Sequence, residues 1–219
     1  MSWDPVWEQL FRKRSWGKYP PEELVRFIFR SYPNPALRKT IKVLDLGCGP
    51  GSCSWFLARE GFLVSGIDGS QTAIQLAQER LQSENLKGDF KIGDFNKMPW
   101  SDSYFDAVID IDSLTCNTAV ASKQILKEIG RILKPNGLLF SMTFKNGCWG
   151  DESGIRIEPH TYQNVTQGPL GNMGITRFST ETEILELYGI FKDLNLEYSI
   201  RSVDNMKHEI SQWIIICKT

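Results

Sequence analysis

Three glycines and an aspartate lie within one short stretch, "VLDLGCGPG" at residues 43–51. Gly47, Gly49 and Gly51 form a G-x-G-x-G pattern directly after an apolar run. Because glycine tolerates left-handed backbone and lets a ligand approach closely, such a loop between a strand and a helix can hold a nucleotide-like cofactor. The dinucleotide fingerprint places its third glycine at the sixth position, where this chain has Ser52. The glycines alone therefore leave the cofactor open.

Carboxylates near the ends of three predicted strands narrow the choice. Asp45 comes two residues before the first glycine, where it would repel a pyrophosphate but suit an ammonium group. Asp68 ends the next apolar run, at the spacing expected for a carboxylate that accepts hydrogen bonds from both ribose hydroxyls. Asp94 and Phe95 follow a third run, where they could hold an adenine. The set favours a nucleoside that carries an amino acid and no phosphate.

The elements that must position these residues alternate along the chain. Strands are predicted at 41–47, 62–68, 90–95, 104–112 and 138–144, and helices at 52–61, 70–85, 118–137 and 179–191. This alternation predicts a parallel sheet with right-handed crossovers. Two closing strands, 196–205 and 210–218, have no helix between them and predict an antiparallel hairpin. Ser70 and Thr180 are predicted helix N-caps, the latter in a capping box with Glu183.

The chain length and charge fit one globular domain. At 219 residues with a net charge of −1, the chain has no general attraction to nucleic acid or to an anionic membrane. We expect an N-terminal helical cap (1–40), a cofactor-binding core (41–145), an insert or lid (146–177), and a C-terminal helix with a β-hairpin (178–219). Five scattered cysteines without a C-x-x-C pair indicate no metal site and a reducing compartment. With no secretory signal or membrane-spanning run, we expect a cytoplasmic monomer or homodimer.

Five motifs, in this order and spacing, resemble those of the class I S-adenosylmethionine-dependent methyltransferases. They are "VLDLGCGPG", "GID", "GDF", "MPWSDSYFDAVID" and "EIGRILKPNGLLFS". The resemblance covers residues 41–143 and implies a three-layer α/β sandwich with a mostly parallel, seven-stranded, Rossmann-like sheet. The last strand would be antiparallel, the helical cap would precede the core, and the cofactor would be S-adenosyl-L-methionine.

Carried over residue by residue, the resemblance implies twelve cofactor-binding positions. They are Tyr19, Asp45, Gly47, Cys48, Gly49, Gly51, Asp68, Gly69, Ser70, Asp94, Phe95 and Asp110. Asp68 would bind the ribose, Asp94 with Phe95 the adenine, and Asp110 the methionine part. Tyr19 would contact the carboxylate end of the cofactor or close the pocket, although helix packing explains it equally well.

The acceptor is expected to be a small polar molecule that is methylated by in-line displacement on nitrogen or oxygen. In the family its pocket is built from segments that correspond here to 16–19, 112–117 and 146–177. His160 is the first candidate for a general base and Asp112 the second. Trp3, Trp7 and Trp16 are interpreted as core anchors. Nucleic acid is disfavoured as an acceptor, because "DIDSLTC" lacks the Pro-Pro pair of adenine methylation and no Pro-Cys occurs in the chain.

Two other functions remain as alternatives. A nicotinamide-dependent oxidoreductase uses the same strand, loop, helix and acid, but the chain lacks the sixth-position glycine and a Tyr-x-x-x-Lys pair. A non-catalytic module that binds the cofactor or a partner protein is the second alternative. The complete set of cofactor-binding positions argues against it.

Overall fold

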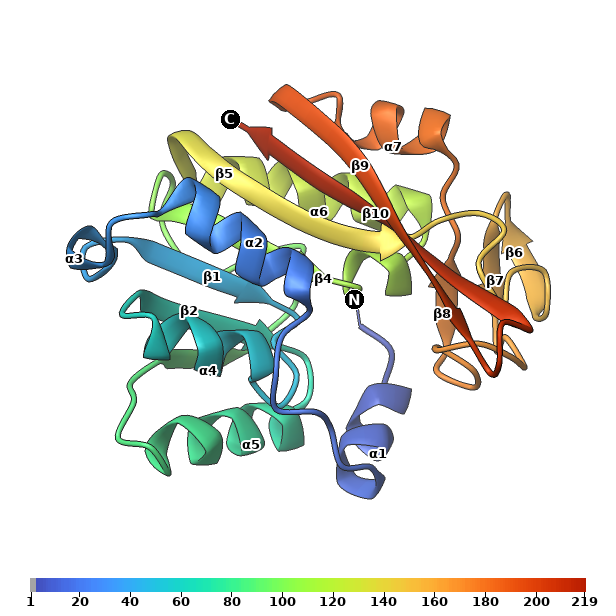
Figure 1. The fold of residues 1–219 in the computed structure, drawn as a ribbon, viewed down its shortest axis with the longest axis horizontal. Coiled ribbons are helices and arrows are strands. Elements are labelled where there is room, and N and C mark those ends of the chain that lie inside the picture. Colours follow the sequence, from blue (N-terminus) through green and yellow to red (C-terminus); the bar gives the residue numbers. More distant parts are fainter. Residues whose placement is uncertain (1–2) are drawn as a thin grey trace.

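A computed structural model describes residues 3–219 of the chain (Figure 1). Its main sheet has seven strands in the order β3-β2-β1-β4-β5-β10-β9. The strands are β1 (Lys42–Leu46), β2 (Leu63–Asp68), β3 (Asp89–Ile92), β4 (Phe105–Ile111), β5 (Leu133–Phe144), β9 (Lys192–Val203) and β10 (His208–Lys218). β10 pairs antiparallel with both β5 and β9, whereas β1 to β5 pair parallel to one another. The predicted mostly parallel sheet with an antiparallel last strand is confirmed.

Helices cover both faces of this sheet. They are α1 (Val6–Lys13), α2 (Glu22–Ser31), α3 (Pro35–Arg38), α4 (Ser52–Arg59), α5 (Gln71–Gln82), α6 (Ala119–Ile132) and α7 (Glu181–Tyr188), with a 3-10 turn η1 (Leu114–Cys116). Buried side chains of α2 and α4 pack with Val43 and Phe140 of the sheet. Those of α6 and α7 pack on the opposite face around Leu44 and Val108. The alternation of Val43 and Leu44 between the two cores is the period-two pattern of a strand covered on both sides.

Both predicted N-caps are present. The Ser70 hydroxyl accepts a hydrogen bond from the N–H of Ala73 at the start of α5. Thr180 and Glu183 form the reciprocal capping box at the start of α7. These caps were predictable because the capping residue and its partner lie within three positions of each other.

Two expectations about element boundaries are corrected. α6 ends at Ile132, five residues before the predicted end, and β5 begins at once with Leu133. Pro135 has no N–H and disfavours helical backbone in the residue before it, so the chain becomes extended at this point. The insert, for which the sequence predicts no strand, contains a three-stranded antiparallel sheet of β6 (Ile155–Glu158), β7 (Thr161–Gln163) and β8 (Ile175–Arg177).

Figure 1 places α1 and the small sheet of the insert on the side of the main sheet to which the arrowheads of β1 and β5 point. This is the side where the parallel strands end and where their connecting loops begin. Among residues 3–219, no helix combines the length and the apolar composition that crossing a bilayer requires.

Close contact between α4 and α5 depends on Gly51. Its backbone has φ +77°, and an added Cβ would lie 2.9 Å from Cβ of Ala77 and 3.0 Å from its Cα. Gly61 also has a left-handed φ, +92°, but an added Cβ there would meet nothing within 4 Å. The two glycines therefore share the backbone constraint and differ in packing.

We expect Gly61→Ala to lower the free energy of unfolding by about 1–2 kcal/mol through left-handed backbone strain. Gly51→Ala should lose about 1–3 kcal/mol more, because α5 must move away from α4. Urea unfolding followed by circular dichroism measures both values. Equal losses in the two variants would show that Gly51 is required for its backbone conformation alone.

Candidate functional site

A cavity of about 320 Å³ lies at the carboxyl ends of β1, β2 and β4. One side is formed by the loop after β1, the end of β2 and the loop after β4. The other side is formed by residues between Trp3 and Pro21 and by Leu170 of the insert. The strand order reverses between β1 and β4, and open α/β sheets bind ligands in the crevice at such a reversal.

The glycine loop is held in place by backbone hydrogen bonds to β2. The N–H groups of Gly47 and Cys48 donate to the carbonyl of Ile67 at 2.8 and 3.1 Å. Gly47 has φ +65°, and an added Cβ would lie 2.0 Å from Oγ of Ser113, so only glycine fits there. Gly49 lines the cavity with φ +49°, and an added Cβ would project toward the ring of Phe11, 3.5 Å away. A side chain at Gly49 would therefore take up space between the loop and α1.

Asp68 fixes two loops with its two carboxylate oxygens. Oδ2 accepts from the N–H of Gly49 at 3.0 Å, and Oδ1 accepts from the N–H of Ser70 at 2.8 Å. The side chain is buried and lines the cavity, and burial raises its pKa to about 6. Asp45 lines the cavity too. It accepts from the hydroxyl of Ser54 at 2.6 Å, and burial raises its pKa to about 6.

Asp112 stands at the end of β4 with an unusual backbone. Its φ is +60°, in the left-handed region that aspartate and asparagine adopt more readily than most non-glycine residues. Nε2 of Gln212 on β10 lies 2.9 Å from each of its carboxylate oxygens. Burial raises the pKa of Asp112 to about 7, opposed by the Gln212 hydrogen bond and assisted by the charge of Asp110. Asp112 is thus a carboxylate on the cavity wall that exchanges protons near neutral pH.

The aromatic residues of the N-terminal segment face the cavity, which corrects the expectation that the tryptophans are only core anchors. Trp3, Trp7, Phe11, Trp16 and Tyr19 all line it. The ring centroids of Phe11 and Trp16 are 5.2 Å apart, and those of Trp7 and Phe11 are 5.8 Å apart. Nε1 of Trp16 is buried and has no hydrogen-bond partner within the described part of the chain. The helical spacing of Trp7 and Phe11, which lie four residues apart on α1, was the signal available in the sequence.

Glu8 of α1 joins this segment to the start of α5. Its carboxylate accepts hydrogen bonds from the hydroxyl of Ser70 and from the hydroxyl and N–H of Thr72, the last two at 2.6 and 3.3 Å. These bonds, the one from Ser70 foremost, lower the pKa of Glu8 to about 2. A carboxylate at the N-terminus of a helix also interacts favourably with the helix dipole. Glu8 therefore holds α1 beside the cavity.

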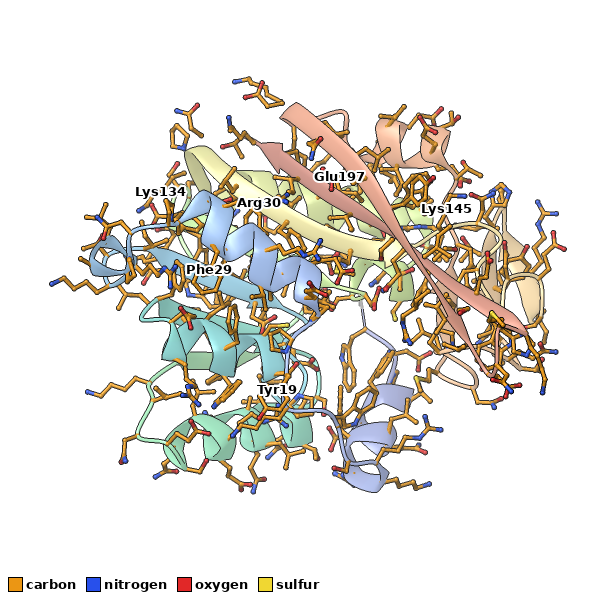
Figure 2. The ribbon with its side chains drawn as sticks, in the orientation of Figure 1. Tyr19, Phe29, Arg30, Lys134, Lys145 and Glu197 are labelled. Carbon is orange, nitrogen blue, oxygen red and sulfur yellow. The ribbon has the colours of Figure 1, made fainter. Side chains whose placement is uncertain are left out.

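Eight of the twelve predicted cofactor residues surround the cavity, together with the predicted base Asp112. The eight are Tyr19, Asp45, Gly47, Cys48, Gly49, Asp68, Gly69 and Phe95. Tyr19 projects from the segment between α1 and α2 and is 74% exposed, so it stands at the rim (Figure 2).

The other four predicted cofactor residues are not part of the cavity wall. Gly51 packs on α5, and Ser70 is a buried cap. Asp94 accepts from the N–H of Asn96 at 2.9 Å. Asp110 is fully buried and accepts from the N–H groups of residues 113 and 114 and from the hydroxyl of Ser141. Asp110 thus stabilises the turn that carries the cavity residue Ser113.

His160 lies away from the cavity, in the turn between β6 and β7. Its Nδ1 is 2.9 Å from Oε1 of Glu183, the capping-box residue of α7, and its side chain is 40% exposed. The residue therefore connects the small sheet to α7 and is not positioned to act in the cavity. The insert reaches the cavity through Leu170 instead.

Comparisons with known proteins agree with this geometry. A family model described as a methyltransferase domain matches residues 37–186. The ubiquinone biosynthesis O-methyltransferase of Pelagibacter ubique is 32% identical over 194 residues, which cover 88% of this chain and 75% of that protein. Methyltransferase GfsG of Streptomyces halstedii is 33% identical over 101 residues, which cover 45% of this chain and 36% of that protein. A solved structure of an S-adenosylmethionine-dependent methyltransferase from Methanosarcina mazei superposes with a TM-score of 0.67 at 25% identity, covering 81% of this chain and 92% of that one.

The contact between Glu8 and α5 predicts how the N-terminal segment responds to substitution. Glu8→Ala should release α1 from the N-terminus of α5, because all three hydrogen bonds to Ser70 and Thr72 are lost. We expect stronger quenching of tryptophan fluorescence by acrylamide, since Trp3, Trp7 and Trp16 become accessible. Glu22→Ala, which removes an exposed ion pair within α2, is the matched control and should leave quenching unchanged. Unaltered quenching in Glu8→Ala would mean that aromatic packing alone holds α1.

Proposed function

The chain belongs to the S-adenosylmethionine-dependent methyltransferases, and we propose that its cavity directs methyl transfer to a nitrogen or oxygen atom of a small acceptor. The observation that carries the proposal is the position of Asp112. This half-buried carboxylate shares one cavity wall with the glycine loop and Asp68. A candidate base for the acceptor and the residues of the cofactor motifs thus line the same cavity.

The residues around the cavity suit S-adenosylmethionine. The free space beside Gly49, which an added Cβ would enter, is open to a ligand that approaches the loop backbone. Asp68 offers carboxylate oxygens to ribose hydroxyls, and Phe95 offers an apolar surface to the adenine. The unpartnered N–H of Trp16 and the hydroxyl of Tyr19 can donate hydrogen bonds to oxygen atoms of the cofactor. When bound, the cofactor supplies an electrophilic methyl group on a positively charged sulfur.

The protein's own contribution is enclosure, alignment and proton removal. The segment that Glu8 holds in place, together with Leu170, covers the carboxyl ends of the strands and reduces the access of water. Asp112 is oriented by Gln212 and accepts the proton that the acceptor must lose. Positioning and a base are sufficient because the methyl donor is already reactive.

The cavity is poorly suited to a dinucleotide. Asp45 would face a pyrophosphate, and no Lys, Arg or His of residues 3–219 lies on the wall to neutralise it. These features disfavour the nicotinamide-dependent alternative for this site.

Asp68→Ala is expected to weaken the binding of S-adenosylhomocysteine by about 1–3 kcal/mol, because charge-assisted hydrogen bonds to the ribose are lost. Isothermal titration calorimetry measures the affinity, and thermal unfolding of the same variant shows whether it is folded. The control is Asp89→Ala on β3, whose exposed carboxylate lies outside the cavity. A folded Asp68→Ala protein with unchanged affinity would refute the ribose assignment.

Turnover at saturating cofactor should rise as the pH increases through about 7, because Asp112 must be ionised to accept a proton. Under that condition the titration of Asp45 and Asp68 affects cofactor affinity rather than kcat. Asp112→Asn should lower kcat roughly 10²–10⁴-fold and remove the pH dependence. The readout is formation of S-adenosylhomocysteine with a cell metabolite extract as the acceptor source.

His160→Ala separates the two bases that the sequence suggested. Because His160 pairs with Glu183 outside the cavity, this variant should keep both the turnover and the pH dependence of the parent protein. If His160→Ala instead loses the pH dependence while Asp112→Asn keeps it, the base is His160. If the parent protein forms no product with any extract, the chain is a non-catalytic binding module.

A further inference from the structure

The charged side chains that line the cavity are all acidic. Four carboxylates line it, those of Asp4, Asp45, Asp68 and Asp112, and the described residues contribute no Lys, Arg or His. Asp45 and Asp68 belong to the cofactor motifs. Asp4 and Asp112 come from other parts of the chain and have no role in that motif set. The acceptor side of the cavity therefore has two carboxylates of its own.

Local hydrogen bonds and packing hold Asp4 in place. Its Oδ1 accepts from the N–H of Val6 at 2.9 Å, at the start of α1. Its Oδ2 lies against Gly174 of the insert, where an added Cβ would be only 2.6 Å away. The N-terminal segment and the insert thus meet at Asp4. Asp112 faces the same cavity from the end of β4, where Gln212 orients it.

The N-terminal segment that carries Asp4 also gives the cavity an aromatic wall. The rings of Trp7 and Trp16 lie 6.2 Å apart between centroids, and Phe11 contacts both. The faces of such rings attract cations, and this attraction increases when the cation is removed from water. Aromatic faces and carboxylates together favour the binding of a cationic ligand over that of a neutral or anionic ligand.

We infer that the acceptor is a small amine that enters the cavity as an ammonium ion, has no carboxylate or phosphate group, and is bound by Asp4 and Asp112 beside the aromatic rings. This inference rests on the proposed methyltransferase function and specifies its substrate class. Before reaction one N–H bond of the ammonium breaks, its proton moves to a carboxylate oxygen of Asp112, and the electron pair stays on nitrogen. The neutral amine is then the nucleophile.

The developing charge favours nitrogen over oxygen. An amine that gains a methyl group becomes positive, and the carboxylate of Asp4 and the ring faces stabilise that charge as it forms, while Asp112 is neutral because it holds the proton. A hydroxyl acceptor would pass toward an alkoxide or phenolate, which the carboxylate of Asp4 would repel. Acidic acceptors would meet the same repulsion, because no described residue on the wall offers a compensating cation.

Three probes of similar size and different charge test the binding preference. Butylammonium, butan-1-ol and butanoate are titrated into the protein saturated with S-adenosylhomocysteine, and the tryptophan fluorescence is followed. Butylammonium should bind at least about tenfold more tightly than the other two, which corresponds to about 1.4 kcal/mol. Asp4→Asn and Asp112→Asn should each remove this preference, and both variants keep an oxygen that accepts from Val6 or Gln212. Asp89→Asn is the control and should retain it.

A second experiment identifies the charge of the natural acceptor. A metabolite extract is separated by ion exchange at pH 7 into cationic, neutral and anionic fractions, and each is supplied with S-adenosylmethionine. Formation of S-adenosylhomocysteine with the cationic fraction supports the inference.

The outcomes separate the inference from the proposed function. Activity confined to the neutral or anionic fraction, equal binding of the three probes, or no binding of butylammonium would overturn the amine assignment while leaving methyl transfer in place. No activity with any fraction would overturn the proposed function itself.

Discussion

The hydrogen bonds of one buried carboxylate connect the parts that form the cavity. Asp68 accepts the N–H of Gly49 in the first loop and the N–H of Ser70 in the second. Ser70 in turn starts α5, and its hydroxyl donates to Glu8 of α1. The glycine loop, the N-terminus of α5 and the N-terminal helix are thereby held together through a few consecutive residues. The position of the aromatic segment beside the cavity depends on this connection.

Removing carboxylates from water costs free energy of folding, and three of the carboxylates concerned line the cavity. Asp45, Asp68 and Asp112 are all more easily protonated than an exposed aspartate, because the cavity wall removes them from water. Perturbed groups gathered in one cleft are typical of functional sites. A ligand with positive charge offsets the cost, and the cofactor has two such groups in its ammonium and sulfonium. The carboxylates therefore unite the cofactor assignment with the proposed amine acceptor.

Features that depend on residues close together in the chain could be predicted from the sequence. The direction in which a side chain points in the folded protein could not. The caps at Ser70 and Thr180, the strand alternation and the order of the motifs each involve residues close together in the chain. The sequence predicts His160 as a site residue because it is a histidine among polar residues of the insert. The small sheet instead turns it toward Glu183. The tryptophans of the N-terminal segment were expected in the core and instead line the cavity. An apolar helical face can cover a cavity as readily as a core.

The sequence by itself determined the sheet, the family and the cofactor loop, because glycine conformations, strand periodicity and motif spacing are local properties of the chain. Only the tertiary structure decided which polar residues face the cavity. Asp4, Asp112 and Gln212 come from the N-terminus, the end of β4 and the last strand, and their meeting depends on how the sheet and the insert pack. That packing places Asp112 on the cavity wall and His160 away from it, and the pKa of Asp112 rises to about 7 because distant segments exclude water from it.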